Sequence, residues 1–190
     1  MVITVFPVEK LNIAASSSEW LKLESKVDTK LGYTSSLWET KLCSKIGGTM
    51  PNIKGDDGAL KTIFSNSKII AVVGHSEKSS RASYQVAKFL QAVGYRVYPV
   101  NPMVKQIDGQ RCYPSLEAIP EPVDIVNVFR HPDYLPEIVE SAIAIQAATL
   151  WTQLKIYHPV AEKRAIEAGL NVIMDACIQI EYQRLGISQK

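Results

Sequence analysis

The strongest constraint on the fold is a pair of apolar runs separated by one helix-length of chain. Residues 69–73 are all apolar and lead into Gly74, and residues 97–100 form a second apolar run that leads into Asn101. Uninterrupted runs rich in β-branched residues are typical of strands that are covered on both faces. The stretch 83–93 between the two runs has helical spacing, so the three segments predict a strand, a helix and a parallel strand.

The same alternation continues to the C-terminus. Apolar runs at 124–129, 148–151 and 171–174 predict three more strands, and helical spacing at 132–146 and 159–168 predicts two more helices. Parallel strands are joined by right-handed crossovers, which place helices against the sheet. We therefore expect an α/β, Rossmann-like fold: a five-stranded, mainly parallel sheet with helices on both faces.

The beginning of the chain differs in composition from the remainder. Residues 1–49 are rich in Ser, contain no Arg and show only weak periodicity. We expect residues 1–55 to form a poorly ordered N-terminal extension and residues 56–190 to form one domain, which opens with a helix capped by Asp56 or Asp57. Two alternatives for the extension are an incorrectly assigned start, with Met50 as the initiator, and a targeting segment, although its acidic residues are unusual in a transit peptide.

Bulk properties exclude several classes of protein. The 190 residues carry a net charge of +2 without a basic cluster, and no apolar run approaches the ~20 residues that span a membrane. The three cysteines, Cys43, Cys112 and Cys177, are widely spaced and are expected to be buried thiols in a reducing compartment. We therefore expect no nucleic-acid partner, no membrane association, no metal site and a cytoplasmic location, with an organelle as the alternative if the extension is a transit segment.

The residues after the first predicted strand favour a bound phosphate. Gly74, His75 and Ser76 follow the strand directly, and Ser80 and Arg81 stand where the next helix begins. Ligands of open parallel sheets lie at the carboxyl ends of the strands, and a helix start offers free N–H groups to an anion. Serine hydroxyls and an arginine add further donors. The alternative is that Ser79 or Ser80 merely caps the helix.

The same region argues against an NAD site. A dinucleotide site of the NAD type has the pattern Gly-x-Gly-x-x-Gly after the first strand and an acid at the end of the second strand. Only Gly74 is present here, and Asn101 and Pro102 stand where the acid is expected. The unit therefore indicates a different nucleotide.

Several motifs taken together resemble one family. The sequence Gly74-His75-Ser76 and the segments 80–84, 94–102, 124–130, 150–154 and 168–175 are similar to those of the small stand-alone CoA-binding proteins. That family in turn resembles the CoA-binding domain of the succinyl-CoA synthetase α subunit. The resemblance extends over residues 56–187, and it implies coenzyme A or an acyl-CoA as the ligand.

The resemblance also implies which residues form the site. Those expected to meet the CoA diphosphate are Gly74, His75, Ser76, Ser80 and Arg81, and Lys105 is expected to reach a phosphate. Those expected around the adenosine are Val100, Asn101 and Pro102, with Phe129 and Arg130 on the adenine side. Those expected on the pantetheine side are Thr152, Gln153 and Leu154.

Two positions depart from the family pattern. Lys155 stands where a Gly is usual, and Ala176 stands where an Arg is usual. If these positions shape the mouth of the site, the affinity for CoA is altered or lost. They motivate one alternative, a domain that has lost its ligand and serves as an interaction surface. In a second interpretation, the Lys155 ammonium replaces the cation lost at position 176.

Residues that could carry catalysis do not form a constellation. His75 has no identifiable partner acid, and His131 and His158 precede prolines at predicted helix starts. Asp124 begins a strand and Asp175 ends one, so they are expected at opposite ends of the sheet. We therefore predict non-catalytic binding of CoA or an acyl-CoA, as a sensor or carrier with an unidentified protein partner. An NAD(P)-dependent oxidoreductase or another Rossmann enzyme is the other alternative.

Overall fold

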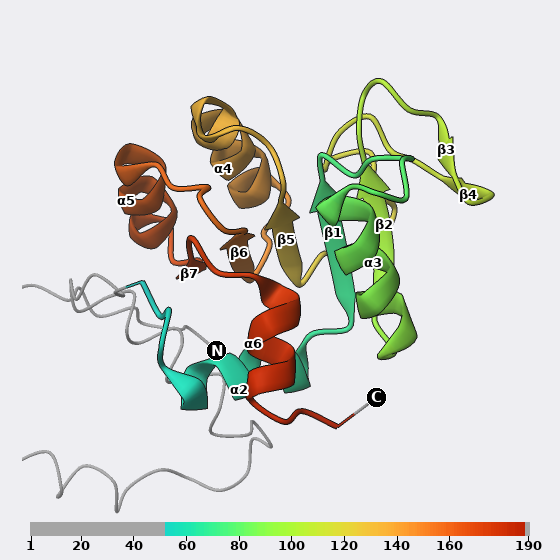
Figure 1. Ribbon diagram of the computed structural model, residues 1–190. Helices are drawn as coiled ribbons and strands as arrows, with labels where there is room; N and C mark the ends of the chain where they lie inside the picture. Colours follow the sequence, from blue (N-terminus) through green and yellow to red (C-terminus); the bar gives the residue numbers. More distant parts are fainter. Residues whose placement is uncertain (1–51, 189–190) are drawn as a thin grey trace, which may run out of the picture. The chain divides into compact units, whose positions relative to one another are not determined.

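The computed structural model describes residues 52–188, in which five parallel strands form one sheet (Figure 1). The strands are β1 (Ile69–Val73), β2 (Arg96–Val100), β5 (Ile125–Val128), β6 (Thr149–Thr152) and β7 (Asn171–Ile173). Their order is β2-β1-β5-β6-β7, and every neighbouring pair is parallel. The predicted Rossmann-like α/β fold is confirmed. Of the extension predicted at residues 1–55, residues 1–51 lie outside the described residues.

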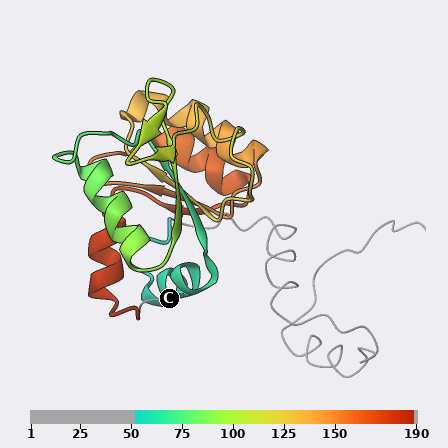
Figure 2. The same ribbon diagram turned by 90° about the vertical axis from the view of Figure 1, so that its right-hand side faces the viewer.

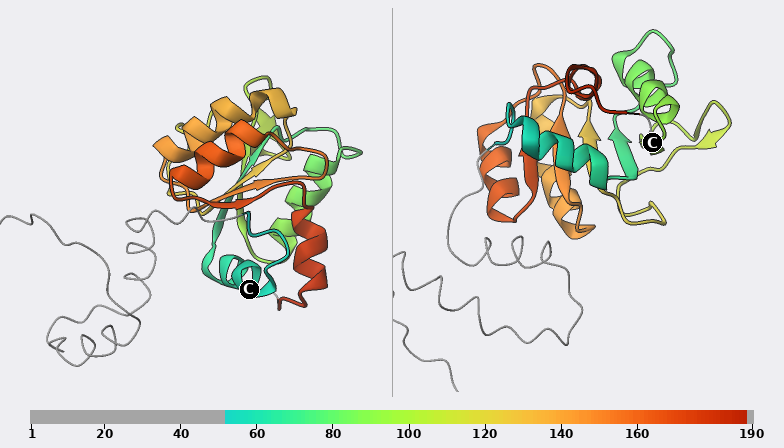
Figure 3. Two further views of the ribbon diagram at one scale, coloured as in Figure 1. Left: turned by 90° about the vertical axis from the view of Figure 1, so that its left-hand side faces the viewer. Right: turned by 90° about the horizontal axis from the view of Figure 1, so that it is seen from below.

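Helices cover both faces of the sheet. α3 (Ala82–Ala92) and α6 (Ile178–Arg184) lie on one face, and α4 (Leu135–Ala144) and α5 (Pro159–Glu167) lie on the other (Figure 2). α2 (Asp57–Asn66) lies at the end of the sheet where the strands begin (Figure 3) and packs into the core on the α3 and α6 side. The sequence did not predict α6.

The alternation of side chains along β1 explains its uninterrupted apolar run. Ala71 and Val73 belong to the core under α4 and α5, whereas Ile70 and Val72 belong to the core under α2, α3 and α6. Successive side chains of a strand point to opposite faces, so a strand covered on both faces needs apolar residues at every position. The sheet therefore stands between two cores, and its polar strand-end loops are free to form a site.

Residues on the N-terminal side of position 56, the predicted start of the domain, already contact the sheet. The Ile53 N–H donates to the Val172 carbonyl at 3.0 Å, and Lys54 Nζ lies 3.0 Å from Asp175 Oδ2. Asp56 then caps α2 by accepting the Ala59 N–H at 3.0 Å. Residues 52–55, which were predicted to belong to the extension, are thus bonded to the edge of the sheet.

A small hairpin that the sequence did not predict joins β2 to β5. It consists of β3 (Gln106–Ile107) and β4 (Gln110–Arg111), and its turn residues Asp108 and Gly109 have φ of 50° and 79°. Positive φ at both turn residues is typical of a tight type I′ hairpin. The Asp108 carboxylate accepts a hydrogen bond from the Tyr84 hydroxyl at 2.7 Å, which attaches the hairpin to α3.

Candidate functional site

A pocket of about 210 Å³ opens at the carboxyl ends of β1, β2 and β5. The chain passes from β1 outward to β2 and then returns to β5 on the other side of β1, so the strand order reverses at this point. Open α/β sheets bind ligands at such a reversal. The residues that line the pocket are Val73, Gly74, Val100, Pro102, Pro114, Ser115, Leu116, Arg130, Tyr134, Glu137, Ile138 and Ser141.

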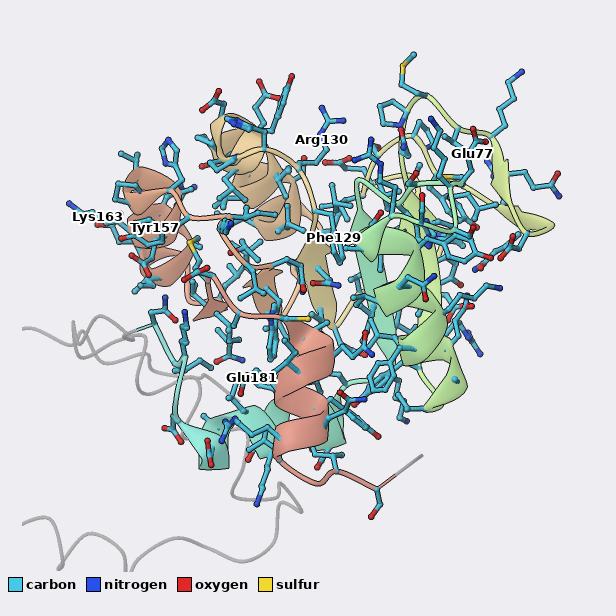
Figure 4. The ribbon with its side chains drawn as sticks, in the orientation of Figure 1. Glu77, Phe129, Arg130, Tyr157, Lys163 and Glu181 are labelled. Carbon is cyan, nitrogen blue, oxygen red and sulfur yellow. The ribbon has the colours of Figure 1, made fainter. Side chains whose placement is uncertain are left out.

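Gly74 brings the end of β1 close to the end of β5. Its φ is +82°, and a Cβ at this position would lie 3.1 Å from Arg130 Cδ and 3.3 Å from the Phe129 carbonyl carbon. A side chain here would push against the backbone after β5. The guanidinium of Arg130 lies over the Tyr134 ring at 4.3 Å, and Figure 4 shows Arg130 beyond the end of β5. Gly74 thus leaves room for the Arg130 side chain at the pocket.

Asn101 links the two loops that form one wall of the pocket. Its Nδ2 donates to the His75 carbonyl at 2.8 Å, and its Oδ1 accepts the Met103 N–H at 3.0 Å. Its own N–H donates to the Tyr113 carbonyl at 2.9 Å. Both ends of the amide side chain therefore have protein partners, and this arrangement holds Pro102 at the pocket.

The start of α3 has no side-chain cap. Its N-cap residue is Arg81, whose side chain makes no capping bond, so the alternative in which Ser79 or Ser80 caps the helix is wrong. Ser83, in the first turn, accepts the Ser76 N–H at 3.1 Å. Ser80 and Arg81 are exposed. The first turn of α3 can therefore offer N–H groups to an anion.

Several basic residues beyond the strand ends form no ion pair within residues 52–188. They include Lys78, Arg81, Lys105, Arg130 and Lys155. By contrast, Arg96, Arg164 and Arg184 pair with carboxylates. Cations without an internal partner can bind the phosphates of a ligand, and arginine can do so through two parallel hydrogen bonds.

His75 lies in the predicted loop, but its ring points away from the pocket. The side chain is buried, and its Nδ1 lies 3.0 Å from the Ser76 carbonyl. The ring meets Tyr84 edge-on and lines a separate cavity of about 160 Å³ with Lys88 and Asp108. Burial lowers the pKa of His75, which favours the neutral ring. His75 reaches the pocket wall through its carbonyl, which Asn101 binds.

The remaining predicted site residues differ in whether a ligand could contact their side chains. Arg130 lines the pocket, whereas Phe129 packs against the core on the α3 and α6 side. Thr152 is fully buried within β6, and Gln153 is buried with its Nε2 2.7 Å from the Oδ1 of Asn127. Leu154 is 55% exposed, so of the three residues predicted at the end of β6 it is the one that a ligand can reach directly.

The sequence prediction missed one wall of the pocket. A 3-10 turn, η3 (Pro132–Tyr134), precedes α4, and Tyr134, Ile138 and Ser141 line the pocket from these two elements. The spacing of four and three residues is that of one helical face, which is the signal that could have found them. Residues 114–116 lie in a loop without any periodic signal.

The structure places the acids and cysteines that the sequence analysis considered. Asp124 accepts the Lys68 and Ile69 N–H groups where the strands begin, whereas Asp175 follows the end of β7, so the two acids lie at opposite ends of the sheet as predicted. Residues 52–188 contain no His, Cys, Asp and Glu cluster suited to a metal ion, and no helix among them could span a membrane. Cys112 is buried and Cys177 is half-buried; Cys43 lies outside the described residues.

Comparison with known proteins identifies the family. The profile of a family described as the CoA binding domain matches residues 68–183, most of the part of the chain that the structure describes. The chain belongs to this family. The resemblance seen in the strand-end motifs is therefore confirmed, and the pocket is a feature of a CoA-binding domain.

The relatives of this CoA-binding domain are of two kinds. The uncharacterized protein YneT of Bacillus subtilis is 39% identical over 123 residues, which cover 65% of this chain and 91% of YneT. A solved structure of a hypothetical protein from Pyrococcus horikoshii OT3 is 38% identical with a TM-score of 0.69, covering 74% of this chain and 99% of that one. Acetate–CoA ligase [ADP-forming] I of Archaeoglobus fulgidus is 36% identical over 38% of this chain, but the match spans only 11% of the ligase.

Proposed function

We propose that the protein binds CoA or an acyl-CoA at the strand-end pocket and acts as a carrier or sensor without catalysing a reaction. The observation that carries this proposal is the position of Arg130, a cation without an ion-pair partner in residues 52–188, in a pocket where the strand order reverses. Membership of the CoA-binding domain family supports the choice of ligand.

The pocket has room for one part of CoA, and the cations near it suit the phosphates. A pocket of about 210 Å³ is smaller than the ~300–1,000 Å³ of sites that enclose a drug-sized ligand, so it suits one part of CoA, the adenosine. The diphosphate would meet the uncapped start of α3 with Arg81, and Lys78 and Lys105 are further cations for the phosphates. The pantetheine arm would then extend over the end of β6 past Leu154.

Three observations support binding without catalysis. The His75 ring is buried and turned away from the pocket, and burial lowers its pKa. Burial raises the pKa of the Cys112 thiol, which disfavours the nucleophilic thiolate. Among the described residues that line the pocket, Glu137 is the one carboxylate, so this lining offers no pair of acids for general acid–base catalysis. The unpaired thiols Cys112 and Cys177 support a reducing compartment, and the cytoplasmic location stays a prediction.

Calorimetric titration of the full chain tests the ligand class. We expect heat with CoA and acetyl-CoA, weaker binding of dephospho-CoA because it lacks one phosphate, and no tighter binding of NAD or NADP. No heat with CoA would contradict the proposal and favour an interaction domain that has lost its ligand. Tighter binding of NAD or NADP would instead favour the oxidoreductase alternative.

Substitution of Arg130 tests the place of binding. Arg130→Gln removes a cation that has no ion pair within the described residues, and we expect it to weaken CoA binding by roughly 10- to 100-fold, the effect of losing hydrogen bonds to a charged group. The matched control is Arg184→Gln on α6, because Arg184 binds Asp57 of α2, at the end of the sheet opposite the pocket. Equal loss in both variants, or loss in neither, would argue against this pocket.

A further inference from the structure

The turn that follows β6 is bound by the carboxylate of Asp175, which lies in a different loop. Residues 153–156 form a turn closed by the Ile156 N–H, which donates to the Gln153 carbonyl at 3.0 Å. Asp175, in the loop after β7, accepts the Lys155 N–H on its Oδ1 at 2.7 Å. Its Oδ2 lies 3.0 Å from Lys54 Nζ. One side chain therefore joins the β6 turn, the β7 loop and the segment that leads into the domain.

A second set of bonds fixes the same turn from inside the sheet. The Thr152 hydroxyl donates to the Ile156 carbonyl at 2.5 Å and accepts the Asp175 N–H at 3.1 Å. The buried Gln153 side chain donates to Asn127 Oδ1 at 2.7 Å, which connects the turn to β5 just before the pocket. Gln153 thus ties the beginning of the turn to β5, and Thr152 of β6 holds its last residue, Ile156, whereas the Leu154 side chain between them is 55% exposed.

The Lys155 backbone needs such support. Its φ is 65°, a left-handed conformation that an ordinary residue adopts only at a cost in steric strain. Asp175 has a φ of 55°, so two residues in this conformation face each other across one hydrogen bond. The Lys155 N–H and the Lys54 ammonium hold the pKa of Asp175 below its usual range, so its carboxylate stays ionised near neutral pH.

We propose that Asp175 is a positioning residue of the CoA site, which holds the β6 turn so that Leu154 borders the pantetheine arm, with Lys54 coupling this position to the start of the domain. The inference rests on the proposed function. Asp175 does not line the nucleotide pocket, so its effect on binding is transmitted through the turn. Ligands that contain the pantetheine arm depend on Asp175, and ligands that end at the diphosphate do not.

Two variants of Asp175 separate its roles. Asp175→Gly removes the carboxylate and keeps a residue that tolerates the positive φ, and Asp175→Asn keeps an acceptor for the Lys155 N–H without the charge. We expect Asp175→Gly to weaken CoA binding by about tenfold, the effect of one lost charge-assisted hydrogen bond, and to change the affinity for 3′-phospho-ADP, the nucleotide half of CoA, less than twofold. Asp175→Asn should retain most of the CoA affinity.

Amide hydrogen exchange gives a readout independent of any ligand. Exchange at Lys155 should become faster in Asp175→Gly and stay slow in Asp175→Asn. Lys54→Met should lower the CoA affinity by less than Asp175→Gly does. The control Lys163→Met should leave the CoA affinity unchanged, since Lys163 pairs with Glu167 on the same helix.

The outcomes distinguish this inference from the proposed function. If the unmodified chain binds CoA but Asp175→Gly binds it equally well, the positioning role is wrong and CoA binding stands. Equal loss of CoA and 3′-phospho-ADP, with normal urea unfolding, would also overturn the role of the turn. If the unmodified chain binds neither ligand, the proposed function itself fails.

Discussion

At the scale of single residues, Gly74 combines a left-handed backbone with a close approach to the loop after β5. Its φ is +82°, and any Cβ would contact both the Arg130 side chain and the backbone of Phe129. We expect Gly74→Ala to lower the free energy of unfolding by about 1–2 kcal/mol through its backbone conformation alone, and to weaken CoA binding because Arg130 must move. Urea unfolding and calorimetric titration measure the two effects.

Gly169 provides a matched control for this substitution. It has a similar φ of +85°, but a Cβ there would find no atom within 4 Å. Gly169→Ala should therefore destabilise the fold by a comparable backbone amount and leave the CoA affinity unchanged. Loss of CoA binding in both variants would mean that the effect of Gly74→Ala comes from general destabilisation.

At the scale of structural elements, the conformation of the turn after β6 explains why the family usually has Gly at the position of Lys155. Lys155 is the third residue of that turn and has a φ of 65°, a conformation that glycine adopts without strain. We expect Lys155→Gly to raise the free energy of unfolding by about 0.5–1 kcal/mol, because relief of strain exceeds the added entropy of the unfolded chain. Lys155→Ala removes the same charge but keeps the strain, so an equal gain in both variants would contradict this explanation.

The long elements could be predicted because several signals agreed. The five strands are short segments rich in buried apolar residues, and Gly94 and Gly169 follow α3 and α5 with φ of 102° and 85°, as expected for residues that end a helix. The β3–β4 hairpin was missed because two-residue strands carry no periodicity, although Asp108-Gly109 is a recognised turn signal. α6 has only seven residues, too few for a clear helical pattern.

The candidate site could be predicted in position but not in orientation. Parallel strands bring all their carboxyl ends to one edge, so Gly74, Pro102 and Arg130 were expected together and do line one pocket. In the loop after a strand, the sequence does not show to which face of the sheet each side chain points. For this reason Phe129 packs on the opposite face from Arg130, and the His75 ring turns towards Tyr84, which sequence order alone could not show.

At the scale of the whole molecule, stability should fall in two stages as the solution is acidified. Burial lowers the pKa of His75 below its ordinary value of 6.5, so the unfolded chain binds a proton more readily and stability declines as the pH falls below about 6.5. Hydrogen bonds from cationic partners lower the pKa of Asp57 and Glu140 below the usual range of carboxyl groups. Their contribution is present above about pH 4 and is lost as the pH falls through the lowered values.

The melting temperature between pH 3 and pH 8 measures these stages. The variant His75→Gln has no titrating ring, so its melting temperature should lack the decline that begins near pH 6.5 and keep the decline below about pH 4. An unchanged upper stage in this variant would mean that another group causes it.

The central claim, that CoA lies at the strand-end pocket of this domain, is tested most directly by two-dimensional NMR of the full chain during a CoA titration. Amide signals of Gly74, Arg130 and Tyr134 around the pocket should shift in a saturable manner, together with those of Ser83 and Leu154 at the proposed diphosphate and pantetheine positions. Signals in α2, at the opposite end of the sheet, should stay in place. No shift with CoA, or saturable shifts confined to residues outside the strand-end loops, would contradict the account.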